Sequence, residues 1–139
     1  MIVIHHNPDC GTSRNVLAII RASGADPVVV DYLTEGWTRP QLQALFAAAG
    51  LTPRTALRVR RSPAEGLGLL DEGVPDDEIL DAMIRHPILV ERPIVASLRG
   101  VRLCRPSQTV LPLLDRMPKG PVFKEDGQMI LNEKGEIVD

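Results

Sequence analysis

The sequence predicts an α/β sandwich, and three observations lead to that fold class. Two β-branched runs, at residues 2–5 and 27–32, flank one helical segment. A region of helices and turns occupies about 36–87, and a hairpin followed by a last helix comes after it. A strand–helix–strand unit joins two parallel strands, whereas a hairpin adds antiparallel ones. The order βαβ, helical insertion, ββα is typical of a thioredoxin-like sandwich, here a single domain over 1–139.

The first strand–helix–strand unit is bounded by residues that interrupt regular structure. Pro8 and Gly11 prevent the first strand from continuing. Thr12 or Ser13 then caps the helix, and Gly24 ends it. The second β-branched run contains three consecutive valines. Such a run is of the kind found in strands that are covered on both faces.

The insertion contains two predicted helices separated by turns. Thr38 caps the first helix, which Gly50 ends. Residues 53–75 are broken by proline and glycine and predict short helical turns. The second helix begins at Asp76 or Asp77, where acidic residues suit a helix N-terminus.

The last third of the chain predicts a hairpin, a helix and a polar tail. The hairpin turns at Leu98–Gly100. Pro106 opens the last helix, in which Pro112 is expected to introduce a kink. The tail, from about 117 to 139, is polar and carries a weak second hairpin signal around Asn132–Gly135.

Composition excludes several classes of function. The chain has 139 residues, which is room for one core. Its 16 basic and 18 acidic residues give a net charge of −2, which argues against a nucleic-acid partner. No apolar run approaches the ~18–20 residues that span a membrane, and the start has no secretion signal. We therefore expect a cytoplasmic protein with no membrane and no nucleic-acid partner.

Cys10 is the candidate nucleophile because it lies where a strand ends and a helix begins. The backbone N–H groups of Gly11, Thr12 and Ser13 and the helix dipole favour negative charge there, either on a thiolate or on an oxyanion substrate. The hydroxyls of Thr12 and Ser13 add donors, and His6 adds a candidate cation. A cysteine in such a place loses its proton readily, and the thiolate is the nucleophile. The alternative is a small buried core residue.

Spacing excludes three familiar cysteine motifs. A phosphatase-type loop needs an arginine six residues after the cysteine, where this chain has Val16. A dithiol motif needs a second cysteine at position 13, which is a serine, so any internal partner is Cys104. The two cysteines and three histidines show no zinc-ligand spacing, so we expect no metal. A single reactive thiol remains, and Cys104 is expected to be a buried strand residue.

The stretch His6–Asn15 resembles the active-site signature of the glutaredoxin-coupled arsenate reductases, the ArsC family. The resemblance continues at Ala56–Arg58, Glu91–Val95, Leu103–Ser107 and Lys119–Gly127. It therefore covers almost the whole chain. It implies a thioredoxin-like fold with a helical insertion and an enzyme of arsenic resistance and detoxification.

The resemblance also implies the roles of individual residues. Carried over by motif, Cys10 attacks arsenate, His6 favours the thiolate, and an arginine triad of Arg58, Arg92 and Arg105 binds the oxyanion. A planar guanidinium suits that role because it donates two parallel hydrogen bonds to an oxyanion. The neighbouring arginines at 60 and 61 are expected to be solvated surface charges.

The resemblance further implies the reductants and one backbone feature. Glutathione is the co-substrate, glutaredoxin is the protein partner, and no cofactor is bound. The peptide bond before Pro93 is expected to be cis.

Two other functions remain open at this point. Cys10–Ser13 is close to the Cys-Gly-Phe-Ser motif of monothiol glutaredoxins, although thiol exchange needs no arginine triad. Spx-like regulators share the same fold and bind RNA polymerase, but many of them carry a Cys-x-x-Cys switch that is absent here.

Overall fold

The computed structural model describes residues 1–138, which divide into two compact units. The first unit combines the two ends of the chain, Met1–Asp31 and the part from Arg92 onward. The second unit is the continuous segment Tyr32–Glu91. That segment includes the helical insertion predicted over about 36–87 and extends it by a few residues at each end.

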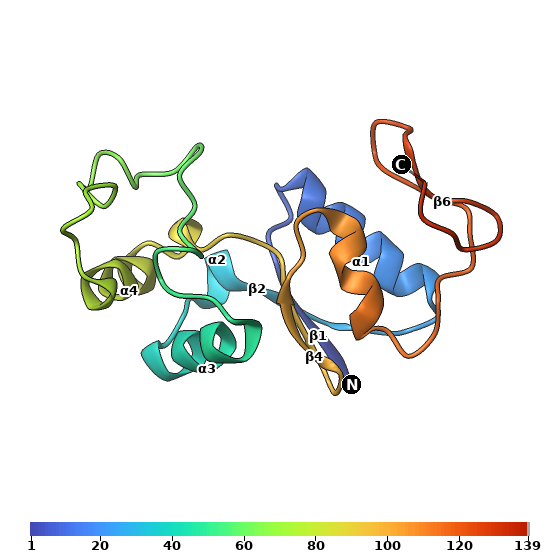
Figure 1. The fold of residues 1–139 in the computed structure, drawn as a ribbon, viewed down its shortest axis with the longest axis horizontal. Helices are drawn as coiled ribbons and strands as arrows, with labels where there is room; N and C mark the ends of the chain where they lie inside the picture. Colours follow the sequence, from blue (N-terminus) through green and yellow to red (C-terminus); the bar gives the residue numbers. More distant parts are fainter. Residues whose placement is uncertain (139) are drawn as a thin grey trace. The chain divides into compact units, whose positions relative to one another are not determined.

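The first unit is built on a four-stranded sheet of order β2-β1-β3-β4 (Figure 1). β1 pairs in parallel with β2 and antiparallel with β3, which pairs antiparallel with β4. The parallel pair and the hairpin are as predicted from the sequence. The strands are β1 (Ile2–His6), β2 (Val28–Asp31), β3 (Ile94–Ser97) and β4 (Gly100–Leu103).

A single hydrophobic core joins this sheet to the helix α1 (Gly11–Ala22) and the 3₁₀-helix η2 (Ser107–Leu113). Figure 1 shows these two helices side by side, and they are in contact. Ile4 of β1 pairs with Val95 of β3, and both belong to this core. Fully buried apolar side chains on neighbouring elements each stabilise the fold by ~1.5–3 kcal/mol. The core therefore holds β1 and α1, which flank Cys10, in fixed register.

Three predictions for this unit are corrected by the structure. β2 is an edge strand, and Val28 and Val29 are 46% and 40% exposed, so the valine run is not covered on both faces. The N-cap of α1 is Cys10 itself, and not Thr12 or Ser13, because the helix begins two or three residues earlier than expected. The predicted last helix is η2, a 3₁₀-helix with a proline inside it, which suits the missing N–H of proline.

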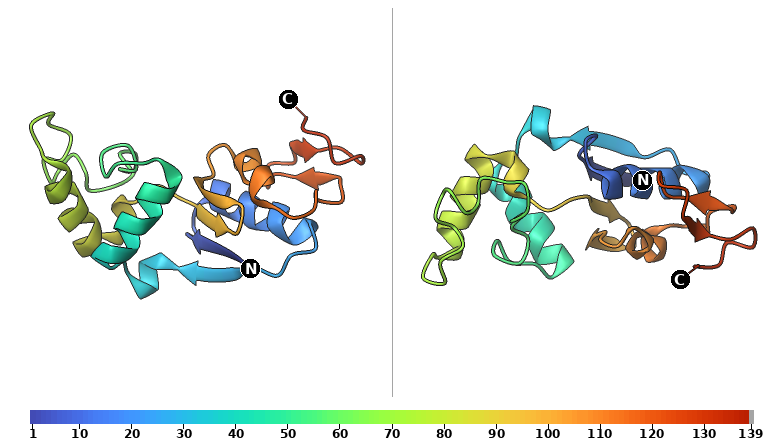
Figure 2. Two further views of the ribbon diagram at one scale, coloured as in Figure 1. Left: turned by 60° about the horizontal axis from the view of Figure 1, so that its bottom comes forward. Right: turned by 90° about the horizontal axis from the view of Figure 1, so that it is seen from above.

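The predicted polar tail is a hairpin packed on the first unit. It consists of β5 (Val122–Phe123) and β6 (Met129–Leu131), which pair antiparallel. Figure 2 shows this hairpin, in red, near α1, which β5 contacts. Val122 and Leu131 are buried in the core, so the tail contributes apolar side chains to it although its composition is polar. The weaker signal around Asn132–Gly135 corresponds to a turn that Leu131 and Ile137 close with an antiparallel bridge.

The second unit is helical, as predicted. Thr38 and Gln41 form a capping box at the start of α3, and Gly50 ends that helix with a φ of +70°. Residues 53–75 form turns and contain no helix. The helices of this unit are α2 (Tyr32–Glu35), α3 (Arg39–Ala49), α4 (Asp76–Arg85) and the 3₁₀-helix η1 (Pro87–Leu89).

Gly120 precedes the hairpin β5–β6 and has no room for a side chain. A Cβ there would lie 1.7 Å from the carbonyl oxygen of Asn132. Because that neighbour is backbone, Gly120→Ala must displace the hairpin, and overpacking of this kind costs ~1–3 kcal/mol. We expect amide exchange at Val122 and Leu131 to accelerate about tenfold or more, measured by hydrogen–deuterium exchange. Gly66→Ala, where the nearest atom is 3.8 Å away, is the control, and equal exchange in the two variants would contradict this packing.

Candidate active site

Cys10 lies between β1 and α1, as the sequence predicts. Its backbone N–H donates to the carbonyl of Asn7 at 3.1 Å, which closes a tight turn before the helix. As the N-cap of α1 it has an extended backbone, and its side chain makes no capping hydrogen bond. The half-buried sulfur therefore lies at the helix N-terminus, where backbone N–H groups and the helix dipole favour an anion.

Ser13 holds the loop before Cys10 from the inside. Its side chain is fully buried, and its Oγ accepts the N–H of Asn7 at 3.1 Å. The same Oγ lies 2.6 Å from Nδ1 of His6. Ser13, which the sequence predicts as an oxyanion ligand, therefore also connects His6 of β1 to the loop before Cys10.

His6 contacts Ser13, which in turn holds the loop before Cys10, and its role toward the thiolate stays a prediction. Burial lowers the pKa of His6, Arg14 and Arg21 act in the same direction, and Asp31 opposes them. The neutral imidazole is therefore favoured over the imidazolium.

Two of the three predicted arginines converge on Cys10. Nη1 of Arg105 lies 3.7 Å from the Cys10 sulfur and donates to the carbonyl of Arg92 at 3.0 Å. The guanidinium of Arg92 also acts on this thiol and lowers its pKa. Arg105, in the loop after β4, and Arg92, two residues before β3, thus both act at the N-terminus of α1.

Arg92 is a buried cation with donors to spare. It is only 7% exposed, and its Nε and Nη1 have no hydrogen-bond acceptor in the structure of residues 1–138. No carboxylate of those residues forms an ion pair with it. Unsatisfied buried donors are costly, and charged ones especially so. These donors suit a ligand that brings its own oxygen acceptors, which is what an oxyanion does.

The surroundings of Cys10 favour its thiolate. Burial raises the pKa of the Cys10 thiol, but hydrogen bonds from the Ser13 backbone N–H and from Arg92 and Arg105 outweigh that effect. The positive charge of Arg92 acts in the same direction. The pKa of Cys10 consequently lies below its ordinary value, so its thiolate forms more readily than that of an ordinary cysteine.

Arg58 belongs to the second unit, where it is well ordered by its neighbours. Nη1 of Arg58 forms an ion pair with Glu91 at 3.1 Å, and Nε donates to the carbonyl of Arg60 at 2.8 Å. The side chains of Arg60 and Arg61 are exposed, as predicted for surface charges. The part of Arg58 in an oxyanion site stays a prediction.

Gly11 and Thr12 open the first turn of α1 and border a hollow of about 320 Å³. The rest of the lining comes from Asn15 of α1, from the two residues after Arg105 and from the hairpin turn. The hollow gives the N-terminal end of α1 access to solvent. Close to the site, the Arg92–Pro93 peptide bond is cis, the geometry that the resemblance implied. The lining residues are Gly11, Thr12, Asn15, Pro106, Ser107, Lys124, Glu125 and Asp126.

Cys104 has the opposite environment to Cys10. It is fully buried in the core of the first unit, and burial raises the pKa of its thiol to about 12. It is therefore inert at neutral pH, in keeping with its prediction as a buried residue.

Metal-binding and membrane-spanning features were also sought in the structure. Residues 1–138 contain no group of three or more His, Cys, Asp and Glu side chains that could hold a metal ion. None of the helices formed by these residues is long and apolar enough to cross a membrane.

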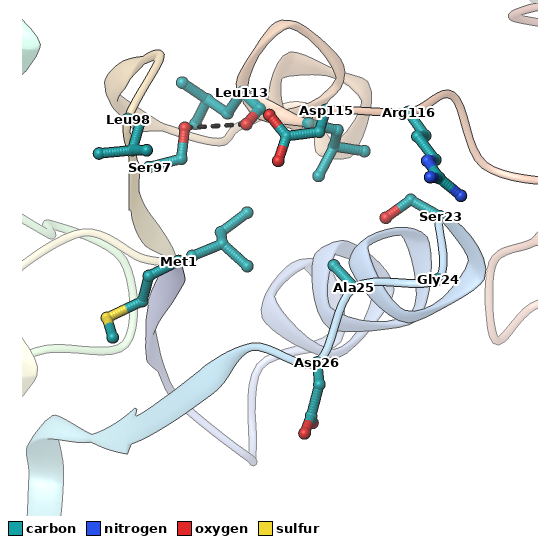
Figure 3. A pocket seen from close by; sticks show the side chains of 12 residues that line it. Met1, Ser23, Gly24, Ala25, Asp26, Ser97, Leu98, Leu113, Asp115 and Arg116 are labelled. Atoms are coloured by element: carbon teal, nitrogen blue, oxygen red, sulfur yellow. Dashed lines mark hydrogen bonds between the residues drawn. The ribbon is translucent and has the colours of Figure 1, made fainter.

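A second hollow, of about 310 Å³, lies at the start of β1 (Figure 3). Met1, Leu98 and Leu113 border it, and Ser97 donates to the Leu113 carbonyl at its edge at 2.8 Å. It contains none of the residues predicted for the active site.

Sequence patterns did not single out Arg14 and Glu125. Nη1 of Arg14 donates to the carbonyl of Pro8 at 2.6 Å, and the same guanidinium forms an ion pair with Glu125. The position of Arg14, one helical turn after Cys10, is a signal that could have marked it. Nothing local marks Glu125, which is 111 positions further along the chain.

Comparisons with known proteins agree with this geometry. Residues 5–113 match the model of the ArsC family. The chain is 63% identical over 138 residues to "Arsenate reductase ArsI2" of Synechocystis sp., covering 99% of each chain. It is 47% identical over 135 residues to the arsenate reductase of Escherichia coli strain K12, covering 97% of this chain and 96% of the relative.

A solved structure, an arsenate reductase from Vibrio cholerae, matches with a TM-score of 0.77 at 37% identity. The match covers 81% of this chain and 97% of that one. This likeness confirms the predicted thioredoxin-like fold. From the family model and from these identities over nearly its whole length, the chain belongs to the ArsC family.

Proposed function

We propose that this chain reduces arsenate to arsenite, with Cys10 as the nucleophile. The observation that carries the proposal is the buried Arg92 guanidinium, which has unpaired donors and contacts a thiol of lowered pKa. An anion-binding cation beside a thiolate suits an oxyanion that a sulfur nucleophile attacks. The relatives from Synechocystis sp. and Escherichia coli, both named arsenate reductases, support the same choice of substrate.

The first chemical step joins sulfur to arsenic. Arg92, Arg105 and the N–H groups of Gly11, Thr12 and Ser13 neutralise the arsenate oxygens, so that the thiolate can approach an anion. The Cys10 sulfur then forms a bond to arsenic, and one arsenic–oxygen bond breaks. The departing oxygen takes up protons and leaves as water, while arsenic stays pentavalent.

The second step supplies two electrons from outside the chain. Ser13 stands where a dithiol motif would have its second cysteine, and Cys104 is buried with its pKa raised to about 12. An external thiol must therefore act, and we assign that role to glutathione. Glutathione bonds to arsenic as a second arsenic–oxygen bond breaks and water leaves. A glutaredoxin thiol then takes the glutathionyl sulfur as a mixed disulfide, and the electron pair left on arsenic reduces it from arsenic(V) to arsenic(III). Water cleaves the Cys10–arsenic bond, which releases arsenite and restores the Cys10 thiol. Glutathione and glutaredoxin are abundant in a reducing cytoplasm, where we place the reaction.

Arg58 is proposed as the third arginine of the oxyanion site. Its side chain is only 12% exposed and is oriented by Glu91, so it is held in one conformation. Preorganised donors of this kind stabilise charge that develops on the oxygens in the transition state.

Replacing Cys10 by serine tests the nucleophile. Cys10→Ser removes the thiolate, so we expect no arsenite production with glutathione and glutaredoxin, measured by arsenic speciation. Cys104→Ser is the matched control and should retain turnover. Undiminished turnover in Cys10→Ser would sink the assignment, and loss in Cys104→Ser alone would indicate an internal disulfide relay. A model disulfide assayed in parallel separates this activity from that of a monothiol glutaredoxin.

Single replacement of the arginines tests the oxyanion site. Removing one donor of this type typically costs ~2.7–4 kcal/mol of barrier, so Arg58→Ala, Arg92→Ala and Arg105→Ala should each lower kcat/KM by about 100-fold or more. Steady-state kinetics with arsenate measure the effect. Arg60→Ala is the control, because that side chain is exposed and only its backbone carbonyl contacts Arg58. An equal loss in Arg60→Ala would show that Arg58 is assigned wrongly.

The pH dependence of Cys10 alkylation tests the cause of its lowered pKa. Arg92→Met removes a hydrogen-bond donor and a positive charge, so the pKa of Cys10 should rise. The alkylation rate with iodoacetamide, followed from about pH 5 to 9, should then have a higher midpoint and fall at neutral pH. Arg99→Met, which alters an exposed ion pair with Asp115, should leave the midpoint unchanged. An unshifted midpoint in Arg92→Met would contradict the assignment that Arg92 lowers the pKa of Cys10.

A further inference from the structure

Glu125, in the turn of the C-terminal hairpin, is bound to the first turns of α1. Its two carboxylate oxygens accept from two nitrogens of Arg14, Nε to Oε1 and Nη2 to Oε2, the latter at 2.8 Å. The backbone N–H of Glu125 also donates to Oδ1 of Asn15 at 3.3 Å. At the other end of the helix, the N–H of Lys119 donates to the carbonyl of Ala22 at 3.1 Å. The tail is therefore attached to α1 near both of its ends.

The third nitrogen of the same guanidinium holds the loop of the nucleophile. Nη1 of Arg14 donates to the carbonyl of Pro8 at 2.6 Å, two residues before Cys10. The guanidinium also lies over Gly11, since a Cβ there would be 3.8 Å from Nη2 of Arg14. One planar group thus connects the tail to the backbone before Cys10 and lies close to Gly11, the residue after it.

Two side chains, those of Ser13 and Arg14, hold the loop before Cys10 from opposite sides. Ser13 holds Asn7 from the buried side, through Oγ and the Asn7 N–H. Arg14 holds Pro8 from the exposed side. With both in place, the backbone that leads to Cys10 is fixed at consecutive residues.

The ion pair between Arg14 and Glu125 is better suited to orienting the Arg14 guanidinium than to stabilising the fold. The side chains of Arg14 and Glu125 are 40% and 52% exposed, and exposed ion pairs contribute little to folding. A bidentate arginine–carboxylate pair, however, fixes the plane of the guanidinium. Fixing that plane aims Nη1 at the Pro8 carbonyl.

We propose that Arg14 is a positioning residue for Cys10, and that the hairpin β5–β6 sets its orientation through Glu125. The match to the family model ends at residue 113, so the hairpin that carries Glu125 lies outside that model. The inference rests on the proposed function for the reaction that it serves, but the state of the thiol tests it independently.

The test compares Arg14→Met, Glu125→Ala and the exchanged pair Arg14→Glu with Glu125→Arg. Both single variants should lower kcat/KM for arsenate about tenfold or more, because displacement of a reacting group by about an ångström is costly. They should also raise the pKa of Cys10 in alkylation profiles, since the Arg14 cation moves away from the thiolate. The exchanged pair should restore amide protection at Val122 and Leu131. It should not restore kcat/KM, because a carboxylate at position 14 cannot donate to the Pro8 carbonyl.

Each outcome decides the proposal. Recovery of kcat/KM by the exchanged pair would show that the two residues only dock the tail. A pKa of Cys10 that falls or stays unchanged in Glu125→Ala would show that Arg14 keeps its place without the hairpin. Either result overturns the inference. Arg99→Met is the control for the loss of an exposed arginine and should match the wild type in both readouts. If the wild type does not reduce arsenate, the proposed function fails, and the alkylation profiles still decide the role of Arg14.

Discussion

The burial of the Arg92 guanidinium beside the Cys10 sulfur is the constraint on which the site depends. A cation with unpaired donors is unfavourable inside a protein unless an anion faces it. The Cys10 thiolate is one such anion, and the oxyanion substrate that we propose is a second. The core that joins β1, α1, β3 and η2 keeps this arrangement in place, because each of these elements carries or adjoins one member of the site. The packed core therefore keeps Arg92 buried beside Cys10, although that burial is itself unfavourable.

Local patterns in the sequence predicted the elements around the site well. The β-branched run at 2–5, the interrupting Pro8 and the apolar periodicity that follows placed Cys10 at a helix N-terminus, which is where the structure has it. The capping box at Thr38 and the hairpin at Leu98–Gly100 were equally readable, because turns and caps depend on neighbouring residues.

Features that depend on distant contacts were not predictable in the same way. The valine run 28–30 fits a buried strand by composition, but its exposure is decided by the absence of a strand beyond β2 in the sheet. The tail looked polar because few of its described residues, among them Val122, Ile130 and Leu131, enter the core. The pairing of Arg14 with Glu125 spans 111 positions, and no local pattern specifies it. The convergence of Arg92 and Arg105 on Cys10 was implied by resemblance and not by spacing.

The burial of Cys104 has a consequence for how the protein behaves over repeated cycles. With one sulfur sealed in the core and serine at position 13, the chain has no second accessible thiol with which to store an oxidised state of its own. In the proposed reaction, the chain therefore keeps no internal disulfide from one turnover to the next. In the reaction that we propose, the rate of turnover then depends on the supply of external thiols around the protein.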